Sequence, residues 1–384
     1  MDLTVVGSIN TDLICYSSRF PLPGETIEGT KFSVGFGGKG ANQCVAARKL
    51  GAAVSLVSRV GDDAFGRNYL EYLKRIGVET GTIPVSTTAA SGVAIITVEQ
   101  TFGNNQIIIV PGANNEISIE DVDEAIKKEL VSKKVMVCQF EACVTFPICV
   151  ACSHVAIVTN FIVILVLCPI IFKANATATL HAMEWAKAHD VLTILDPAPA
   201  PNPHSDFAPL LPRFLAASSI VCPNETEAAA LTGIPRWEVQ PDQIPEASIP
   251  WLLALWKRSV KYPLVTLGLS GVIALLPRSE SDLITAMDVR VLHCDQLPDD
   301  KAIFHLRAPV HAKALDTTGA GDCFTGALAF YISKYPGLKM VEKIRRSVWI
   351  ASQSVLRMGT QASFYSRDEL HPSLFDDKKE FTWP

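Results

Sequence analysis

The stretch Asp316-Thr317-Thr318-Gly319-Ala320-Gly321-Asp322 runs directly into residues 323–332, an apolar segment that is compatible with a helix. Gly319 and Gly321 let the backbone turn tightly and approach a ligand closely. The helix would direct its first N–H groups and the positive end of its dipole at this turn, which favours a phosphate or an oxyanion. Asp322 would lie beside it as a base for an attacking hydroxyl. A plain glycine turn capped by Asp is the alternative, but the flanking residues favour phosphoryl transfer.

The composition is that of a globular α/β protein. The 384 residues suffice for one large domain with an appendage or for two domains, and 48% apolar against 19% charged residues argues against global disorder. A net charge of -5 without a basic block argues against a nucleic-acid-binding scaffold. No signal peptide is expected. The ten irregularly spaced cysteines are expected to be reduced, since Cys149 and Cys152 lack the further ligands of a zinc site.

Short apolar runs alternate with helical stretches along most of the chain. We expect buried strands at 3–6, 54–60, 135–140, 192–196, 220–222 and 264–267, and helices at 40–50, 66–76, 119–130, 174–188, 225–231 and 322–334. This order predicts a three-layer α/β/α sandwich with a mostly parallel sheet, whose ligands bind beyond the carboxyl ends of the strands. The proline-rich residues 197–212 and 234–250 are expected to be loops, and 277–315 to hold only a strand or two.

A separate small β-sheet is expected from two segments, residues 25–36 and 91–111. The first follows a Pro-Leu-Pro-Gly turn at 21–24, and the second contains a hairpin-like connection at 102–105. Both would emerge on the side of the glycine-rich motifs. We therefore expect this sheet to form a lid over the site.

Two motifs near the N-terminus are suited to a polar ligand. Asn10 and Asp12 follow the first strand, where an amide and a carboxylate can hold vicinal hydroxyls; an Asx turn is the alternative. Residues 35–43 form a glycine-rich loop that enters a helix but lacks the Walker spacing. This loop would let backbone amides and Asn42 close on the ligand.

Two later motifs also stand at strand ends. Asn224 and Glu227, three residues apart at a helix start, could order the water shell of a Mg²⁺ ion or form a helix cap. Residues 266–271 turn through glycines after a strand, which suits a nucleotide that passes close to the backbone. Each motif is weak alone, but their order along the chain is jointly specific.

Together these motifs resemble the ribokinase family of carbohydrate kinases from residue 3 to about residue 365. Residues 37–42 resemble the family's first signature and 316–328 its second. The resemblance implies one kinase domain over residues 1–384, which transfers the γ-phosphate of ATP to the 5-hydroxyl of D-ribose with Mg²⁺ and K⁺. It also implies a homodimer paired through the lids, a cytoplasmic location with the nucleus as a second one, and neither nucleic-acid nor membrane partners.

The resemblance assigns a role to each motif residue. Asp322 would be the catalytic base, and the backbone of Gly319, Ala320 and Gly321 the anion hole. The sugar would be bound by Asn10, Thr11, Asp12, Gly38, Lys39, Gly40, Asn42, Glu141 and Asp322 itself. The nucleotide would be bound by Asn224, Thr266, Leu267, Gly268, Leu269, Ser270, Gly271 and Gly321, with Glu227 near Mg²⁺. The monovalent cation would be bound by Asp316, Thr318, Ser354, Arg357, Gly359 and Ser363, mostly through backbone carbonyls.

Residues 142–172 depart from the family pattern, because they contain no Asp, Glu, Lys or Arg. Residues 155–172 have a borderline length for a membrane span, but a span would separate Asn42 from Asp322 and prevent the site from assembling. We interpret 142–172 as foreign to the fold, because its removal joins Glu141 to Lys173 and restores an ordinary parallel crossover.

Three functions therefore remain open: an active kinase for ribose, a kinase for another sugar or a nucleoside, and a non-catalytic relative or inactive isoform. Two smaller departures bear on the kinase. Val348 replaces an Asn that relatives often place near the adenine, and Arg357 replaces a small residue of the cation loop.

Overall fold

The computed structural model describes residues 1–101, 105–141, 174–200, 208–236, 238–283, 287–309, 311, 314–377 and 381. Within them, a central sheet has the strand order β14-β15-β13-β12-β11-β10-β9-β1-β4. Its strands are β1 (Leu3–Val6), β4 (Val54–Val57), β9 (Val135–Gln139), β10 (Leu192–Asp196), β11 (Ile220–Val221), β12 (Tyr262–Thr266), β13 (Val272–Pro277), β14 (Val289–Leu292) and β15 (Lys301–Leu306). Neighbours from β4 to β12 are parallel, and those beyond β12 are antiparallel.

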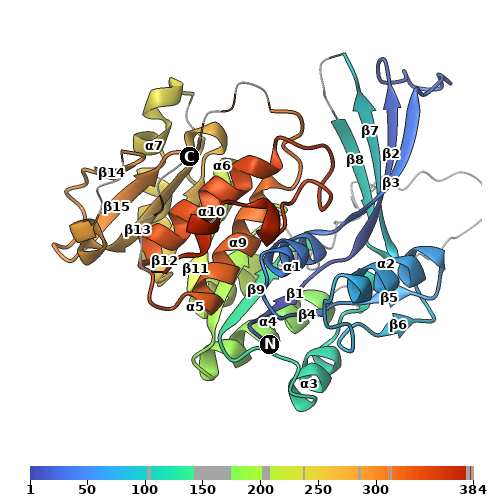
Figure 1. Ribbon diagram of the computed structural model, residues 1–384, viewed down its shortest axis with the longest axis horizontal. Helices are drawn as coiled ribbons and strands as arrows, with labels where there is room; N and C mark the ends of the chain where they lie inside the picture. Colours follow the sequence, from blue (N-terminus) through green and yellow to red (C-terminus); the bar gives the residue numbers. More distant parts are fainter. Residues whose placement is uncertain are drawn as a thin grey trace, which may run out of the picture.

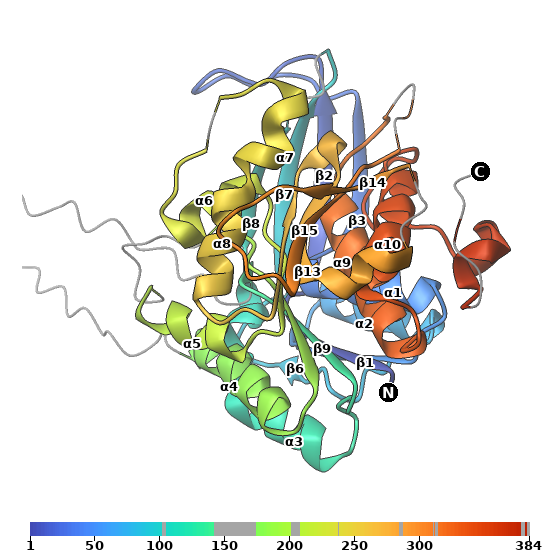
Figure 2. The ribbon, with the colours of Figure 1, turned by 90° about the vertical axis from the view of Figure 1, so that its left-hand side faces the viewer.

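Helices cover both faces of this sheet (Figures 1 and 2). One face carries α1 (Lys39–Lys49), α9 (Ala320–Lys334) and α10 (Met340–Ser354), and the other carries α3 (Ile119–Lys127), α4 (Ala174–Ala188), α5 (Leu211–Ala217), α6 (Glu225–Thr232) and α8 (Ile249–Lys257). Along β9, Val135 and Val137 pack on the first face while Met136 and Cys138 pack on the second, as the two-residue period of a strand requires. The predicted three-layer fold is confirmed.

The lid sheet is a separate four-stranded sheet of β3 (Lys31–Gly37), β2 (Asn10–Ser17), β7 (Gly92–Glu99) and β8 (Asn105–Val110), in that order. It projects from the main body beside α2 (Ala64–Arg75), as Figure 1 shows. The expected strand at 25–36 begins only at Lys31, because Glu25 instead closes a turn through hydrogen bonds to Arg19 and the Leu22 N–H. Of the expected hairpin connection, residues 102–104 lie outside the described part.

Several other expectations were wrong. Residues 10–17, for which no strand was expected, form β2. The expected strand at 54–60 divides into β4 and β5 (Val60–Gly61), which pairs with β6 (Val85–Ser86). Of the two proline-rich segments expected to be loops, the second contains α7 (Ile244–Ala247). Helices α5 and α8 begin in the last two residues of the first and the second segment. Each of these helices has Pro in its first turn, where no N–H is needed.

Short 3-10 helices complete the described chain: Gly112–Glu116, Ala208–Leu210, Pro241–Gln243, Gly268–Ser270, Arg278–Leu283, Arg367–Glu369 and Pro372–Phe375. No helix in the described ranges is long and apolar enough to cross a membrane. Residues 142–172 lie outside those ranges, and so do the hypotheses made for them, including the borderline membrane span and the pair Cys149 and Cys152. Among the cysteines that the structure describes, Cys15, Cys44, Cys222, Cys294 and Cys323 are free thiols.

Candidate active site

Asp322 is buried in the first turn of α9, where it meets the N-terminal half of α1. Asn42 Nδ2 donates to Asp322 Oδ2 at 2.9 Å, and Gln43 Nε2 donates to Asp322 Oδ1 at 3.0 Å. Lys39 Nζ lies 3.7 Å from Asp322 Oδ1. Both carboxylate oxygens are therefore held by α1, some 280 residues earlier in the chain.

A second buried carboxylate, Asp196 at the end of β10, lies beside the first. Lys39 Nζ is 3.9 Å from Asp196 Oδ2, and Gln43 Nε2 donates to the same oxygen at 2.7 Å. Burial, together with the charges of Glu227 and Asp322, raises the pKa of Asp196 to about 7. Burial also raises the pKa of Glu227, whereas the surrounding carboxylates raise the pKa of Lys39 in spite of its burial. The centre therefore holds more acidic groups than its one lysine neutralises.

Asn42 is itself held from behind by a buried chain of hydrogen bonds. Gln361 Nε2 donates to Asn42 Oδ1 at 2.9 Å and to the Tyr69 hydroxyl at 2.8 Å, and that hydroxyl donates to the carbonyl of Gly37 at 2.7 Å. Because its Oδ1 accepts from Gln361, the amide nitrogen of Asn42 is directed at Asp322.

Asn10, Thr11 and Asp12 lie on β2, at the base of the lid sheet, and all three are buried. Asn10 Oδ1 accepts from Asn114 Nδ2 at 2.9 Å. Gly37 and Gly38 pass close to this group: a Cβ on Gly37 would lie 2.3 Å from Asp12 Oδ1, and one on Gly38 would lie 2.6 Å from the Asn10 nitrogen. Glycine at both positions lets the loop before α1 close against these polar residues.

Burial, with the nearby charges of Glu141 and Asp322, raises the pKa of Asp12 from 3.8 to about 7. The folded protein therefore binds this proton more tightly than the unfolded chain, and the contribution of Asp12 to stability falls as the pH rises from about 4 to 7.

We expect Asp12→Asn to stabilise the ligand-free protein by roughly 2 to 4 kcal/mol at pH 8, and by less at pH 5, because asparagine cannot ionise. Urea unfolding at both pH values measures the difference. Asp242→Asn, which alters an exposed carboxylate, serves as the control and should show no such trend. A gain from Asp12→Asn that does not change with pH would contradict the assignment.

Glu141 follows β9 and closes over the start of α1. Its Oε2 accepts from the backbone N–H of Lys39 at 2.6 Å and from the Ser8 hydroxyl. Gly40 packs against the end of β1, where a Cβ would lie 2.6 Å from the carbonyl carbon of Gly7. This close approach brings the N-terminus of α1 to the carboxyl ends of β1 and β9.

The predicted nucleotide residues form a second group beyond β11 and β12. Asn224 Oδ1 accepts from the Glu227 N–H at 2.9 Å and Glu227 Oε2 accepts from the Asn224 N–H at 2.8 Å, so the helix-cap alternative is observed. Asn224 also pairs with Thr266 as a β-bridge. After Thr266, the turn through Leu267, Gly268, Leu269, Ser270 and Gly271 has positive φ at both glycines and leaves Leu269 exposed.

The predicted cation residues lie on two loops that are joined by Asp316. Asp316 Oδ1 accepts from the Thr318 N–H and Oδ2 from the Gly359 N–H, both at 2.9 Å. Ser354, the last residue of α10, and Ser363 are both buried. The side chain of Arg357 points away from these loops, since it lies over the Tyr365 ring at 3.6 Å and pairs with Glu369 at 2.9 Å.

A cleft lies between the lid sheet and these loops. Its lid wall includes Asp12, Tyr16 and Ile107, and its opposite wall includes Asp316 and Gly359. Of the residues predicted from sequence, Asp12, Asp316, Thr318 and Gly359 line this cleft, and the role of each stays a prediction.

Sequence reasoning missed the residues that hold these groups in place: Ser8, Gln43, Tyr69, Asn114, Gln139, Asp196 and Gln361. Two of them could have been found from their place in the sequence pattern. Asp196 ends a predicted buried strand, as Glu141 nearly does, and Gln43 stands next to Asn42 at the start of a predicted helix. The others come from distant segments that only the fold brings together.

Comparisons with known proteins agree with this geometry. The family described as "pfkB family carbohydrate kinase" matches residues 1–367. The chain is 37% identical over 375 residues to a ribokinase of Mus musculus, covering 97% of this chain and 94% of the relative. It is 30% identical to a deoxyribokinase of Salmonella typhi, covering 97% and 99%. An Arabidopsis thaliana ribokinase solved with ribose and ATP superposes with a TM-score of 0.68 at 25% identity, over 96% of each chain. This chain belongs to the pfkB family of carbohydrate kinases.

Proposed function

We propose that the chain is an ATP-dependent ribokinase, which converts D-ribose and ATP to D-ribose 5-phosphate and ADP. The similarity to mouse ribokinase over nearly the full length of both chains supports this substrate. The observation that carries the proposed chemistry is the Asp322 carboxylate, held through both oxygens at the N-terminus of α9. In this position a carboxylate can accept a proton beside the helix end that stabilises a phosphoryl group.

In the reaction, Asp322 accepts the proton of the sugar 5-hydroxyl while that oxygen attacks the γ-phosphorus. The bond from the γ-phosphorus to the bridging oxygen breaks, and ADP leaves with the electron pair. The first N–H groups of α9, at Gly319 to Gly321, have no acceptor within the helix and would bind the transferring phosphoryl oxygens. Gly321 supports this role, because a Cβ built on it meets no protein atom within 4 Å and so leaves room for a ligand.

The sugar would be held on the lid side of the cleft. Asp12 would accept hydrogen bonds from vicinal hydroxyls, and Asn10 and Asn42 would supply amide groups. Lys39 and Glu141 lie close enough to complete the set, with Thr11, Gly38 and Gly40 contributing backbone. Closure of the lid sheet over this group would exclude water from the transferring phosphoryl group.

The nucleotide would lie along the other half of the site. The 266–271 turn offers backbone groups with little side-chain obstruction, because a Cβ on Gly268 meets nothing within 4 Å. Asn224, at the start of α6, would contact the phosphates. Its neighbour Glu227 is a buried carboxylate beside Asp322 and Lys39.

The residues present fit both metals of the proposal. Mg²⁺ keeps much of its water and binds through one or two carboxylates and substrate phosphates, which suits Glu227 in a centre with excess negative charge. When bound, Mg²⁺ neutralises charge on the ATP phosphates. K⁺ would be held by oxygens of Asp316, Thr318, Ser354, Arg357, Gly359 and Ser363, on the two loops that Asp316 joins.

We also propose a cytoplasmic homodimer that pairs through the lid sheets, with the nucleus as a second location. The lid sheet exposes large apolar side chains from three of its strands: Phe32, Val34, Ile95, Ile107, Ile108 and Val110. Such a surface is typical of a protein–protein contact. Light scattering of the purified chain measures its mass, and a monomer would contradict the pairing.

The test of the proposed function is ADP release with ribose as the acceptor. We expect turnover that requires ribose and Mg²⁺ and increases with K⁺. Fructose, adenosine and 2-deoxyribose serve as competing substrates, the last because the Salmonella relative is named a deoxyribokinase. If kcat/KM for any of these compounds is higher than that for ribose, that compound replaces ribose as the proposed substrate. A chain that binds ribose without turnover would be a non-catalytic relative.

A variant without residues 142–172 separates the kinase from the effect of its apolar segment. If this segment is foreign to the fold, its removal should raise the soluble yield and the ribose-dependent activity. An active full-length chain whose solubility and activity do not change on deletion would contradict that hypothesis. A full-length chain that becomes active only on deletion would be a damaged isoform of an intact kinase.

A further inference from the structure

The side-chain amide of Gln43 joins the candidate base to a second carboxylate. Gln43 is fully buried on α1, and its Nε2 donates to Asp196 Oδ2 at 2.7 Å and to Asp322 Oδ1 at 3.0 Å. A primary amide nitrogen carries two hydrogens, so each carboxylate receives one. Through this single nitrogen, α1 connects the end of β10 to the start of α9.

The orientation of the Gln43 amide is fixed from its other end. Gln139, the last residue of β9, donates from Nε2 to Gln43 Oε1 at 2.6 Å. Because the oxygen accepts from Gln139, the nitrogen must face Asp196 and Asp322. The position of the Gln139 side chain in turn requires glycine at residue 7, because a Cβ on Gly7 would lie 1.9 Å from Gln139 Oε1. The Gln43 amide therefore cannot rotate by 180° without disturbing the ends of β1 and β9.

These contacts decide how Asp322 can move. Asn42 holds its Oδ2 and Gln43 holds its Oδ1, so rotation of the carboxylate would break one hydrogen bond or both. Lys39 lies at 3.7 Å and 3.9 Å from Asp322 and Asp196, and its ammonium group is a point charge that sets no plane. The directional restraint on Oδ1 comes from Gln43.

We propose that Gln43 is a positioning residue for phosphoryl transfer, which fixes the plane of the Asp322 carboxylate by tethering it to Asp196. It acts on the base and makes no contact with the substrate. This role rests on the proposed kinase function, since it concerns the base of that reaction. A base held in the attack geometry needs no reorganisation at the moment of reaction, and small displacements of reacting groups are costly.

The test is Gln43→Met, which keeps the unbranched shape and removes the two hydrogen bonds that the amide donates and the one that it accepts. We expect kcat for ribose to fall by about 10- to 100-fold while the KM for ribose stays within about twofold, because the sugar contacts are untouched. Thr4→Val is the matched control. Thr4 is also fully buried in the central sheet and hydrogen-bonded to Ser55, but it has no contact with the site. It should lose stability and keep its kcat.

An unchanged kcat in folded Gln43→Met would overturn the proposal, and so would a raised KM with an unchanged kcat, which would make Gln43 a sugar ligand. If Gln43→Met does not fold, Gln139→Met decides by the same criteria, because it releases the Gln43 amide from its fixed orientation. If the parent enzyme does not phosphorylate ribose, the proposed function fails separately. Crystal structures of parent and variant then decide, and an Asp322 carboxylate that keeps its plane in the variant overturns the role of Gln43.

Discussion

Replacing Asp322 with asparagine should lower kcat for ribose phosphorylation by about 10²- to 10⁴-fold, the usual contribution of a general base. Asparagine keeps the shape of the side chain but cannot accept the proton of the attacking hydroxyl. Steady-state kinetics with ribose and ATP measure the loss. Ribose binding, measured by calorimetry, should change little, because the remaining polar groups of the sugar site are intact.

The stability of Asp322→Asn distinguishes a loss of catalysis from a loss of folding. Asp322 shares the centre with Asp12, Asp196 and Glu227, whose pKa values are all raised, with Asp322 among the charges responsible. Removal of its charge relieves this repulsion, whereas the new amide nitrogen cannot accept the hydrogen bond that Asn42 or Gln43 donates. Urea unfolding of Asp322→Asn is therefore measured beside its kinetics, and a folded variant shows that a loss of activity is chemical in origin. Asp242→Asn is again the control. An Asp322→Asn enzyme with more than a tenth of the parental kcat would contradict the assignment of Asp322 as the base.

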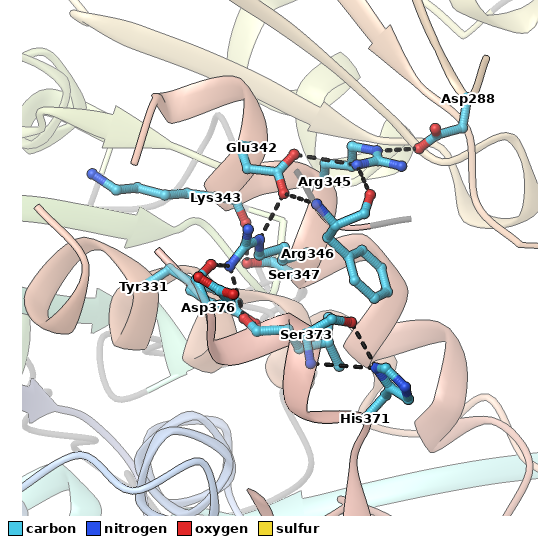
Figure 3. A network of polar contacts seen from close by, with 12 residues as sticks. Asp288, Tyr331, Glu342, Lys343, Arg345, Arg346, Ser347, His371, Ser373 and Asp376 are labelled. Atoms are coloured by element: carbon cyan, nitrogen blue, oxygen red, sulfur yellow. Dashed lines mark hydrogen bonds and ion pairs between the residues drawn. The ribbon is translucent and has the colours of Figure 1, made fainter. Parts of the chain in front are cut away.

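The largest loss of stability is expected from Arg346→Ala on α10. The guanidinium of Arg346 is fully buried, and its Nε donates to Glu342 Oε1 at 2.6 Å. Its Nη1 donates to the carbonyls of Leu374 at 2.9 Å and Asp376 at 2.8 Å. Figure 3 shows Arg346 between Glu342 and Asp376, so that one side chain ties the C-terminal segment to α10.

Removing one partner of a buried ion pair typically costs about 3 to 5 kcal/mol, because the other charge stays buried without compensation. Arg346→Ala should therefore lower the free energy of unfolding by about that amount, as measured by denaturant titration. Arg213→Ala is the control, since Arg213 pairs with Glu184 on the surface, and such pairs contribute about 1 kcal/mol or less. A loss of under 1 kcal/mol in Arg346→Ala would show that the network does not hold the C-terminal segment.

The neighbouring Arg345 shows why sequence reasoning did not find this network. Arg345 and Arg346 are both buried, and Arg345 pairs with Asp288 at 2.6 Å (Figure 3). Charged side chains are almost never buried unless paired, and their partners here lie up to 57 residues away. No local pattern in the sequence predicts such a pairing, and α10 itself was not expected.

The local structure, by contrast, could be predicted wherever the spacing of apolar residues agrees with the residues that typically begin or end a helix or strand. The strands Leu3–Val6 and Leu192–Asp196 and the helix Ala174–Ala188 have the predicted bounds. The lid strand β2 was missed because its residues show no two-residue alternation and because it begins shortly after β1 yet belongs to another sheet. A change of sheet depends on which strand pairs with which, and pairing is not a local property.

The sequence by itself determined most strands of the central sheet and several of the helices beside it, the glycine turns and the types of side chain at the candidate site. The turn before α9 depends on Gly319 at a φ of 78°, which its own residue type permits. Only the tertiary structure decided which side chains meet. Asn42 and Gln43 reach Asp322 across about 280 residues, and Asp196 joins them from a third segment. Such contacts arise because packing of the sheet and helices brings remote segments together, whereas sequence patterns report only neighbours along the chain.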